Sequence, residues 1–400
     1  MISKTLPFAV KPIRKSKAQS TEQRLLVCCS RNKRPIRVFR KSGNDTLPFI
    51  IPDPVSTPEL MITDARVLQP EFIPGEVKHR DAEVNHLSAA LDPITDGNTA
   101  DTTFLFGPSG VGKTCIAQFI VEQLRETVVD LNHKYVNCWE DHTRFKTLYR
   151  ILDGINHTFD IHRQSTPKDV LLERLREYDG PPYIVILDEV DQLEDKDLLY
   201  ELYRVRGITM ILIANSEQEL FASLDGRLNS RFHMCTRIRF DTYGNDALIA
   251  ILRDRVRWGL VNGVIDTGCL EVIADHAAGD ARTAIGILRK AAQTAAQNGH
   301  SEIRQDVIRD VVPEAKAEID QRSLDKLTDH QRVLYETIRN RGEITPGELY
   351  ETYNEQVAEP KTQRMVRNYL AKLEHYNLII ANGHTPTSQF GFLQITSSQT

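Results

Sequence analysis

Residues Gly107–Thr114 combine residue types and a spacing suited to holding phosphate groups. The segment reads Gly-Pro-Ser-Gly-Val-Gly-Lys-Thr, with an apolar strand predicted before it at 103–106 and a helix predicted after it. In such a loop, glycines let backbone N–H groups turn toward an anion, Lys113 offers a cation to the β- and γ-phosphates, and Thr114 offers its hydroxyl to Mg²⁺. We therefore predict a nucleoside triphosphate site made by Gly107, Pro108, Ser109, Gly110, Val111, Gly112, Lys113, Thr114 and Cys115.

Two acidic residues, Asp188 and Glu189, follow directly on the continuous apolar run 183–187. Beside a phosphate loop, the first carboxylate is expected to order the Mg²⁺ shell together with Thr114, and the second to polarise the attacking water. Such a pair is costly to bury unless a cation neutralises it. Asn215 ends the next apolar run, where its amide is predicted to orient water against the γ-phosphate. This combination predicts an ATPase site.

Two arginines are candidates for stabilising the charge that develops on a transferred phosphoryl group. Arg282 lies in the run Gly-Asp-Ala-Arg at a predicted helix start, from which it is expected to reach back to the nucleotide. Arg231 precedes a predicted strand and is expected to project toward a neighbouring protomer as an arginine finger, with Arg227 as the alternative. A surface salt bridge is the competing interpretation for Arg282 and for Arg231.

The composition is that of an ordinary globular protein of two or three domains. Of the 400 residues, 40% are hydrophobic and 26% are charged. The sequence contains no apolar run long enough to span a membrane and no secretion signal at its start. The six cysteines lack metal-ligand spacing and are expected to be free thiols. We therefore expect a cytoplasmic, nucleoid-associated protein with no membrane partner.

The charge is unevenly distributed along the chain. Residues 1–60 contain 12 Lys or Arg against 4 Asp or Glu, which leaves 38 against 51 in the remainder. This first segment lacks helical or strand periodicity, so we expect a basic, disordered extension. A DNA-binding arm is the alternative, and Met61 is a possible natural start, because pattern and composition both change there.

Alternating apolar and helical patterns predict an α/β core over residues 61–240, with a five-stranded parallel sheet. Its strands are expected at 103–106, 134–137, 183–187, 208–213 and 236–240. No strand is predicted in the next segment, 241–320, which is expected to be an all-α lid domain. Its helices are expected at 245–258, 268–277, 281–297 and 304–318.

The pattern of the last unit, residues 321–400, predicts a winged helix with three helices and a hairpin. Two capping-box starts, at Thr328 and Thr345, open the first two helices, and the third is expected at 361–376. One face of that third helix carries side chains suited to reading bases in the major groove. The predicted hairpin tip, His384–Gln389, has no Lys or Arg, so its electrostatic contribution to DNA binding should be small. The predicted DNA-reading residues are Gln363, Arg364, Arg367, Asn368 and Lys372.

The order of these motifs resembles the AAA+ ATPases, with Asn215 as sensor 1 and Arg282 as sensor 2. The further order of core, lid and winged helix is similar to the archaeal origin-recognition (Orc/Cdc-type) DNA replication initiators. The runs 67–81, 136–138, 187–193 and 279–282 are similar to that family as well. The resemblance implies that Pro74, His79 and Arg80 lie beside the adenine. It also implies that an insertion containing Arg144 and Lys146 touches DNA.

As function, the resemblance implies an initiator that binds replication origins on double-stranded DNA and helps load the replicative helicase. ATP and ADP with Mg²⁺ would be its cofactors, weak ATP hydrolysis would act as a switch, and copies would self-associate on DNA. Two alternatives stay open. One is a paralogous transcription or replication regulator that uses ATP structurally, and the other is a Holliday-junction-type AAA+ motor.

Overall fold

The computed structural model describes residues 61–128, 130–162, 166–325, 327–376, 378–382 and 392–395. The expected basic extension at 1–60 and the predicted hairpin tip at 384–389 lie outside these residues. Among the described residues, no helix is long and apolar enough to cross a membrane.

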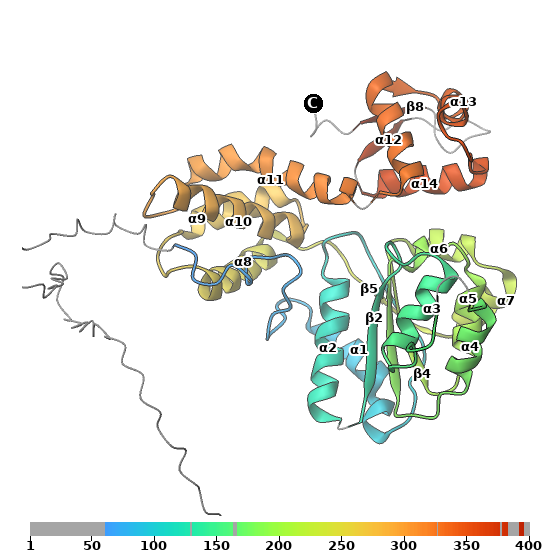
Figure 1. Cartoon of the computed structure of the whole chain (residues 1–400). Helices are drawn as coiled ribbons and strands as arrows, with labels where there is room; N and C mark the ends of the chain where they lie inside the picture. Colours follow the sequence, from blue (N-terminus) through green and yellow to red (C-terminus); the bar gives the residue numbers. More distant parts are fainter. Residues whose placement is uncertain are drawn as a thin grey trace, which may run out of the picture. The chain divides into compact units, whose positions relative to one another are not determined.

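The core is a five-stranded parallel sheet, as predicted (Figure 1). The strands follow the order β2-β3-β4-β1-β5, so the strand before the phosphate loop lies between β4 and β5. Consequently the carboxyl ends of β1, β3 and β4, which lead into the predicted site residues, meet at one edge of the sheet. The strands are β1 (Thr103–Phe106), β2 (Asn132–Asn137), β3 (Tyr183–Asp188), β4 (Ile208–Ala214) and β5 (Thr236–Arg239).

Helices cover both faces of this sheet, which explains the continuous apolar runs of its central strands. Ile184 and Ile186 of β3 belong to one buried cluster with α1 and α2, whereas Val185 and Leu187 belong to another with α3, α4 and α5. Figure 1 shows these two groups of helices on opposite sides of the strands. The helices of the core are α1 (Asp81–Leu91), α2 (Lys113–Thr127), α3 (Arg144–Asp153), α4 (Lys168–Arg176), α5 (Asp197–Tyr203), α6 (Glu217–Ser223) and α7 (Gly226–Phe232), with short 3-10 turns at Asp92–Asp96 and Val190–Gln192.

Four helices without an intervening strand form the lid, in agreement with the prediction. Their buried residues, mostly alanine, leucine and isoleucine, make a separate cluster. Aspartates cap two of them, since Asp266 accepts the N–H of Cys269 at 2.7 Å and Asp280 accepts the N–H of Arg282 at 2.7 Å. The helices are α8 (Asn245–Gly259), α9 (Thr267–Ala277), α10 (Ala281–Gln297) and α11 (Gln305–Asp325), the last extending beyond the predicted end at 318.

The C-terminal part combines three helices with a three-stranded antiparallel sheet of order β6-β8-β7. Both predicted helix starts are capping boxes: Thr328 N–H donates to Gln331 Oε1 at 3.0 Å, and Thr345 N–H donates to Glu348 Oε2 at 3.1 Å. Strand β6 was not predicted, because two residues carry too short a pattern. The elements are α12 (Asp329–Arg341), β6 (Glu343–Ile344), α13 (Pro346–Gln356), α14 (Gln363–His375), β7 (Ile379–Asn382) and β8 (Phe392–Ile395).

Candidate nucleotide site and its neighbours

The phosphate loop has the backbone geometry that its glycines predicted, and the lid packs directly on it. Gly110 has φ +75°, and a Cβ at this position would lie 1.9 Å from Oδ1 of Asp280. The carbonyl of Gly110 also accepts the N–H of Ala281 at 3.1 Å. Only glycine satisfies both the left-handed backbone and the close approach of the lid. The start of α10 and the loop therefore form one structural unit.

Lys113 is buried at the centre of the loop, where oxygen atoms surround its ammonium group. Its Nζ donates to the carbonyls of Gly107 and Pro108 at 2.6 and 2.7 Å and to Oδ1 of Asn215 at 3.0 Å. Burial lowers the pKa of Lys113 to about 8, and the negative charge of Asp188 opposes that shift. A bound polyphosphate would supply the anionic partner that this desolvated cation lacks. The residues present thus fit a nucleoside triphosphate.

Asp188 is held by three donors in a position suited to organising a metal ion. Its Oδ2 accepts the Thr114 hydroxyl at 2.7 Å and the Tyr135 hydroxyl at 2.9 Å, while its Oδ1 accepts the N–H of Glu189 at 2.9 Å. The structure thereby brings together Thr114 and Asp188, the two predicted Mg²⁺ residues. A hydroxyl and a carboxylate are hard oxygen ligands of the kind Mg²⁺ prefers, so the donor set fits this ion.

Tyr135 is a residue of this site that the sequence reasoning missed. It lies within β2, directly before Val136, whose side chain belongs to the cluster on the opposite face of the sheet. Burial raises the pKa of Tyr135, and the charge of Asp188 raises it further, so the hydroxyl keeps its proton and acts as a donor. Alternate residues of a strand point to opposite faces of the sheet, and this alternation places Tyr135 on the same face as the phosphate loop. The sequence pattern of β2 could therefore have indicated this residue.

Glu189 is partly buried next to Asp188 in an unusual backbone conformation, with φ +53°. Burial raises the pKa of Glu189 to about 7, the charge of Asp188 adds to this, and the Tyr376 hydroxyl and Lys372 oppose it. Left-handed conformations of non-glycine residues are uncommon and cluster at functional sites. A carboxyl group that titrates near neutral pH is suited to taking a proton from water.

One cavity gathers most of the residues predicted for catalysis. Asn215 and Arg282 line it together with the phosphate loop and the acidic pair. The cavity has a volume of about 170 Å³ and is partly open to solvent. Arg282 lies in the first turn of α10, and its positive charge contributes to lowering the pKa of Lys113. Core and lid thus contribute side chains to the same cavity.

Arg231 lies apart from this cavity, on α7. Its guanidinium is exposed and lies over the Tyr200 ring, 4.9 Å from the centroid. The alternative residue, Arg227, also lies over Tyr200 and pairs with Asp225 at 2.8 Å. An arginine finger acts on a neighbouring copy, so the contacts of Arg231 and Arg227 within one protomer do not decide which of them has that role.

Of the three residues assigned to the adenine, Pro74 lines the cavity, whereas His79 and Arg80 are not among the residues that line it. Arg80 is buried, pairs with Glu83 at 2.7 Å, and lies 4.1 Å from the centroid of the Tyr243 ring. Apolar and aromatic side chains from the lid and from the segment before α1 line the cavity as well, and they were not among the site residues predicted from the sequence. The additional lining residues include Val77, Tyr243, Ile251 and Ile285.

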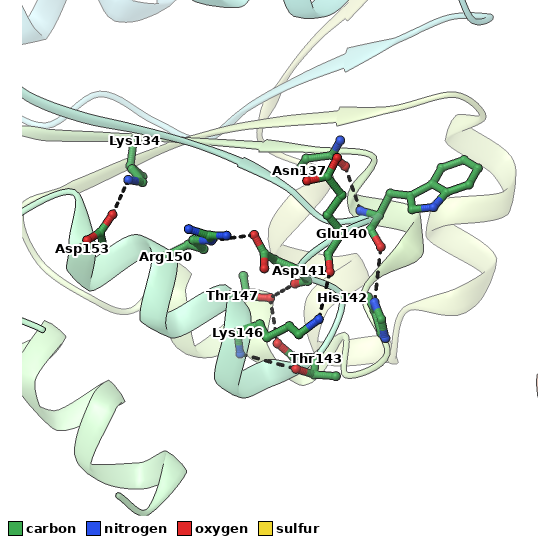
Figure 2. A network of polar contacts seen from close by, with 11 residues as sticks. Lys134, Asn137, Glu140, Asp141, His142, Thr143, Lys146, Thr147, Arg150 and Asp153 are labelled. Carbon is green, nitrogen blue, oxygen red and sulfur yellow. Dashed lines mark hydrogen bonds and ion pairs between the residues drawn. The ribbon is translucent and has the colours of Figure 1, made fainter. Parts of the chain in front are cut away.

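The two predicted DNA contacts of the insertion are engaged within the core. Arg144 pairs with Asp195 at 3.1 Å and with Glu201. Lys146 donates to the carbonyl of Glu140 at 3.2 Å, in the network that Figure 2 shows around the start of α3. Their partners were invisible to a pattern analysis because two of them come from residues more than 50 positions away.

Helix α14 presents four of its five predicted DNA residues to solvent. Gln363, Arg364, Arg367 and Asn368 are all exposed. Lys372 is instead 6% exposed, and its Nζ lies 3.9 Å from the centroid of the Trp139 ring. The predicted DNA-reading face is therefore split between exposed residues and one lysine that contacts the core.

Comparison with known proteins identifies the family. Residues 96–220 match the AAA domain and residues 249–312 match the Cdc6 AAA+ ATPase-type lid domain. The chain is 64% identical over 308 residues to ORC1-type DNA replication protein 1 of Halobacterium salinarum. This match covers 77% of this chain and all of that protein. The chain belongs to the ORC1-type DNA replication proteins. The family resemblance inferred from the motifs is thereby confirmed.

Two further matches, one to a relative and one to a solved structure, show how much of this ORC1-type chain the similarity covers. ORC1-type DNA replication protein 9 of H. salinarum is 48% identical over 340 residues, covering 85% of this chain and 96% of that protein. The structure of the Aeropyrum pernix Orc1 protein in complex with DNA has a TM-score of 0.66 and 24% identity, and the match covers 84% of this chain and 93% of that one. At this identity the structural match supports the fold: an AAA+ core with its lid.

Proposed function

We propose that this protein is an ATP-dependent initiator that binds replication origins on double-stranded DNA and helps load the replicative helicase. The observation that carries this proposal is the single cavity in which the phosphate loop, Asp188, Glu189, Asn215 and Arg282 meet, in a chain of the ORC1 type. We place its action in the cytoplasm, at the nucleoid.

ATP and Mg²⁺ are the proposed ligands of the cavity. Thr114 and Asp188 would hold the metal ion, which when bound neutralises charge on the β- and γ-phosphates. Lys113 would exchange its loop carbonyls for phosphate oxygens, and Arg282 would contact the γ-phosphate from the lid. Asn215 would orient the attacking water and Glu189 would accept its proton. We expect slow hydrolysis that resets a switch.

DNA contact is assigned to residues 321–400, as a winged helix in which α14 reads bases. Arginine and asparagine or glutamine side chains make bidentate contacts with guanine and adenine edges, and α14 exposes Gln363, Arg364, Arg367 and Asn368. Arg144 and Lys146 would have to leave their present partners to reach DNA. Arg231 is assigned to self-association on DNA, where it would approach the ATP site of a neighbouring copy.

A paralogous regulator is the second candidate, because H. salinarum has at least two relatives of this chain, at 64% and 48% identity. Genome-wide mapping of the bound sites distinguishes the two functions. Binding to inverted repeats beside an AT-rich region supports initiation, and binding scattered over promoters contradicts it. A Lys113→Ala variant mapped in parallel tests whether site choice depends on ATP.

A further inference from the structure

The segment that precedes the core in the sequence is fastened to the lid. Residues 61–78, which we call the strap, lie before the first helix of the core. The Met61 carbonyl accepts the N–H of Val261 at 2.9 Å, and the side chains of Met61 and Leu68 belong to the buried cluster of the lid. A Cβ at Gly259 would lie 3.0 Å from Leu68 Cδ2, so α8 and the strap are in close contact. The first part of the strap therefore packs as part of the lid.

Arg255, on α8, holds both ends of a turn in the strap. Its Nη1 donates to the carbonyl of Val67 at 2.8 Å, and its Nη2 donates to the carbonyl of Phe72 at 2.9 Å. The guanidinium also lies over the Phe72 ring, 5.0 Å from the centroid, and Arg255 is only 6% exposed. A planar fork of donors can bind two acceptors and stack on a ring at the same time. One lid side chain thus fixes the backbone from 67 to 72.

This turn and the residues after it line the nucleotide cavity. Pro70 lies within the turn and Pro74 follows it, and both line the cavity together with Arg255. Ile251, one helical turn before Arg255 on α8, lines it as well. Apolar surfaces of this kind suit the faces of a nucleobase, whereas the phosphate loop and Lys113 suit phosphates. The lining therefore divides into a part suited to a base, from strap and lid, and a part suited to phosphates, from the core.

The other end of the strap is attached to the core. Val77 packs against the buried cluster that contains residues of α1 and α2, and Arg80, just after the strap, pairs with Glu83 of α1 at 2.7 Å. The strap thus runs from the lid to the core along the cavity. A cavity wall that is already ordered spares the ligand the cost of ordering it on binding. A strap released from Arg255 would lose two charge-assisted hydrogen bonds, and its prolines would be held less firmly.

We propose that Arg255 is a positioning residue for nucleotide binding, which holds the strap in the shape that accommodates the base. Its two terminal nitrogens donate to the strap, so it acts through Pro70 and Pro74. The inference rests on the proposed function, because it takes the cavity as the ATP site.

The test compares the affinities for ATP and for inorganic tripolyphosphate, which has a chain of three phosphates without base or ribose. Both are titrated calorimetrically with Mg²⁺ into the full chain and into Arg255→Met, which keeps a long unbranched side chain without N–H donors. ATP affinity should fall roughly tenfold, as expected when hydrogen bonds from a charged group are lost, and tripolyphosphate affinity should stay within about twofold. The matched control, Arg253→Met, removes an exposed arginine of the same helix and should bind both ligands like wild type.

Two further variants separate positioning from a general loss of structure. Arg255→Lys keeps a cation that can donate to a strap carbonyl, so it should recover part of the ATP affinity. Phe72→Leu removes the ring beneath the guanidinium from the strap side. It should lower ATP affinity roughly threefold and leave tripolyphosphate binding unchanged.

Wild-type ATP affinity in Arg255→Met, or an equal loss of affinity for both ligands, overturns this role of Arg255. If Arg255→Met does not fold, Arg255→Lys and Phe72→Leu decide by the same comparison: a loss confined to ATP supports the role, and equal binding or a shared loss contradicts it. A wild-type protein that binds neither ligand contradicts the proposed ATP site instead.

Discussion

Lys113 and Lys372 are both buried ammonium groups, and they differ in what surrounds them. Around Lys113 are three oxygen acceptors within 3.0 Å, whereas Lys372 lies over the face of Trp139. Burial lowers the pKa of each to about 8. Oxygen atoms on a rigid loop prepare a cation for one anion in one place. An aromatic face holds a cation more weakly and leaves it available to another partner.

The largest effect is expected at Lys113. Lys113→Ala removes the cation that the phosphates require, so ATP affinity should fall by roughly 100-fold or more, as expected when charge-assisted hydrogen bonds are lost. Isothermal titration with ATP and Mg²⁺ measures this. Lys290→Ala, which breaks a lid ion pair with Glu314, is the matched control and should bind normally. Unchanged affinity in Lys113→Ala would contradict both the site and the comparison with Lys372.

A smaller effect is expected at Tyr135. It tests the role of the oxygen atoms that surround the phosphate loop. Tyr135→Phe removes one of the two hydroxyls on Asp188 Oδ2, so this carboxylate is less well oriented. The Mg²⁺ concentration at half-maximal hydrolysis should rise by roughly tenfold, while ATP binding without Mg²⁺ stays unchanged. Tyr183→Phe, which removes a buried hydroxyl that donates to the Ile151 carbonyl, is the control. An equal Mg²⁺ requirement in Tyr135→Phe and wild type would exclude Tyr135 from the metal site.

The smallest effect concerns the pH dependence of stability at Lys372. Its folded pKa of about 8 lies below the ordinary value of 10.5, so between these pH values the unfolded chain binds more protons. The free energy of unfolding should therefore rise with pH in this window, by up to about 1.4 kcal/mol per pH unit from this group. Below pH 8, Lys372 is charged in both the folded and the unfolded state, so it does not contribute to the pH dependence of the free energy of unfolding.

Urea unfolding at pH 7.5 and 9.5 measures this contribution in Lys372→Met, with Lys290→Met as control. The gain in stability between the two pH values should be smaller in Lys372→Met than in wild type and in the control. An equal gain in stability in all three proteins would mean that Lys372 is solvated rather than packed on Trp139.

Much of the nucleotide site was predictable because its residues follow the ends of parallel strands. Gly107 and Asn215 come directly after β1 and β4, Asp188 is the last residue of β3, and strands of a parallel sheet end at a common edge. The five strands and the lid helices were predicted at nearly their observed positions for a related reason. Long apolar runs and helical periodicity are local features, and tertiary packing here agreed with them.

The order of the strands, in contrast, required the structure. The chain passes from β1 to β2, yet β1 lies between β4 and β5, because contacts between distant residues select the pairing. The same holds for Arg80, which donates to the carbonyl of Asp241 and lies over the ring of Tyr243, and for Arg144, whose carboxylate partners follow β3 in the sequence. A sequence marks such side chains as charged without indicating which charge they meet.

The sequence alone determined that this chain has a triphosphate loop, an acidic pair, a lid arginine and a basic face on a C-terminal helix. Those are properties of residue type and spacing along one segment. The tertiary structure decided which of them meet: Asp280 against Gly110, Tyr135 on Asp188, and Lys372 on Trp139 rather than in solvent. These contacts join residues between 53 and more than 200 positions apart, and they depend on the shape of the folded surfaces rather than on any local pattern.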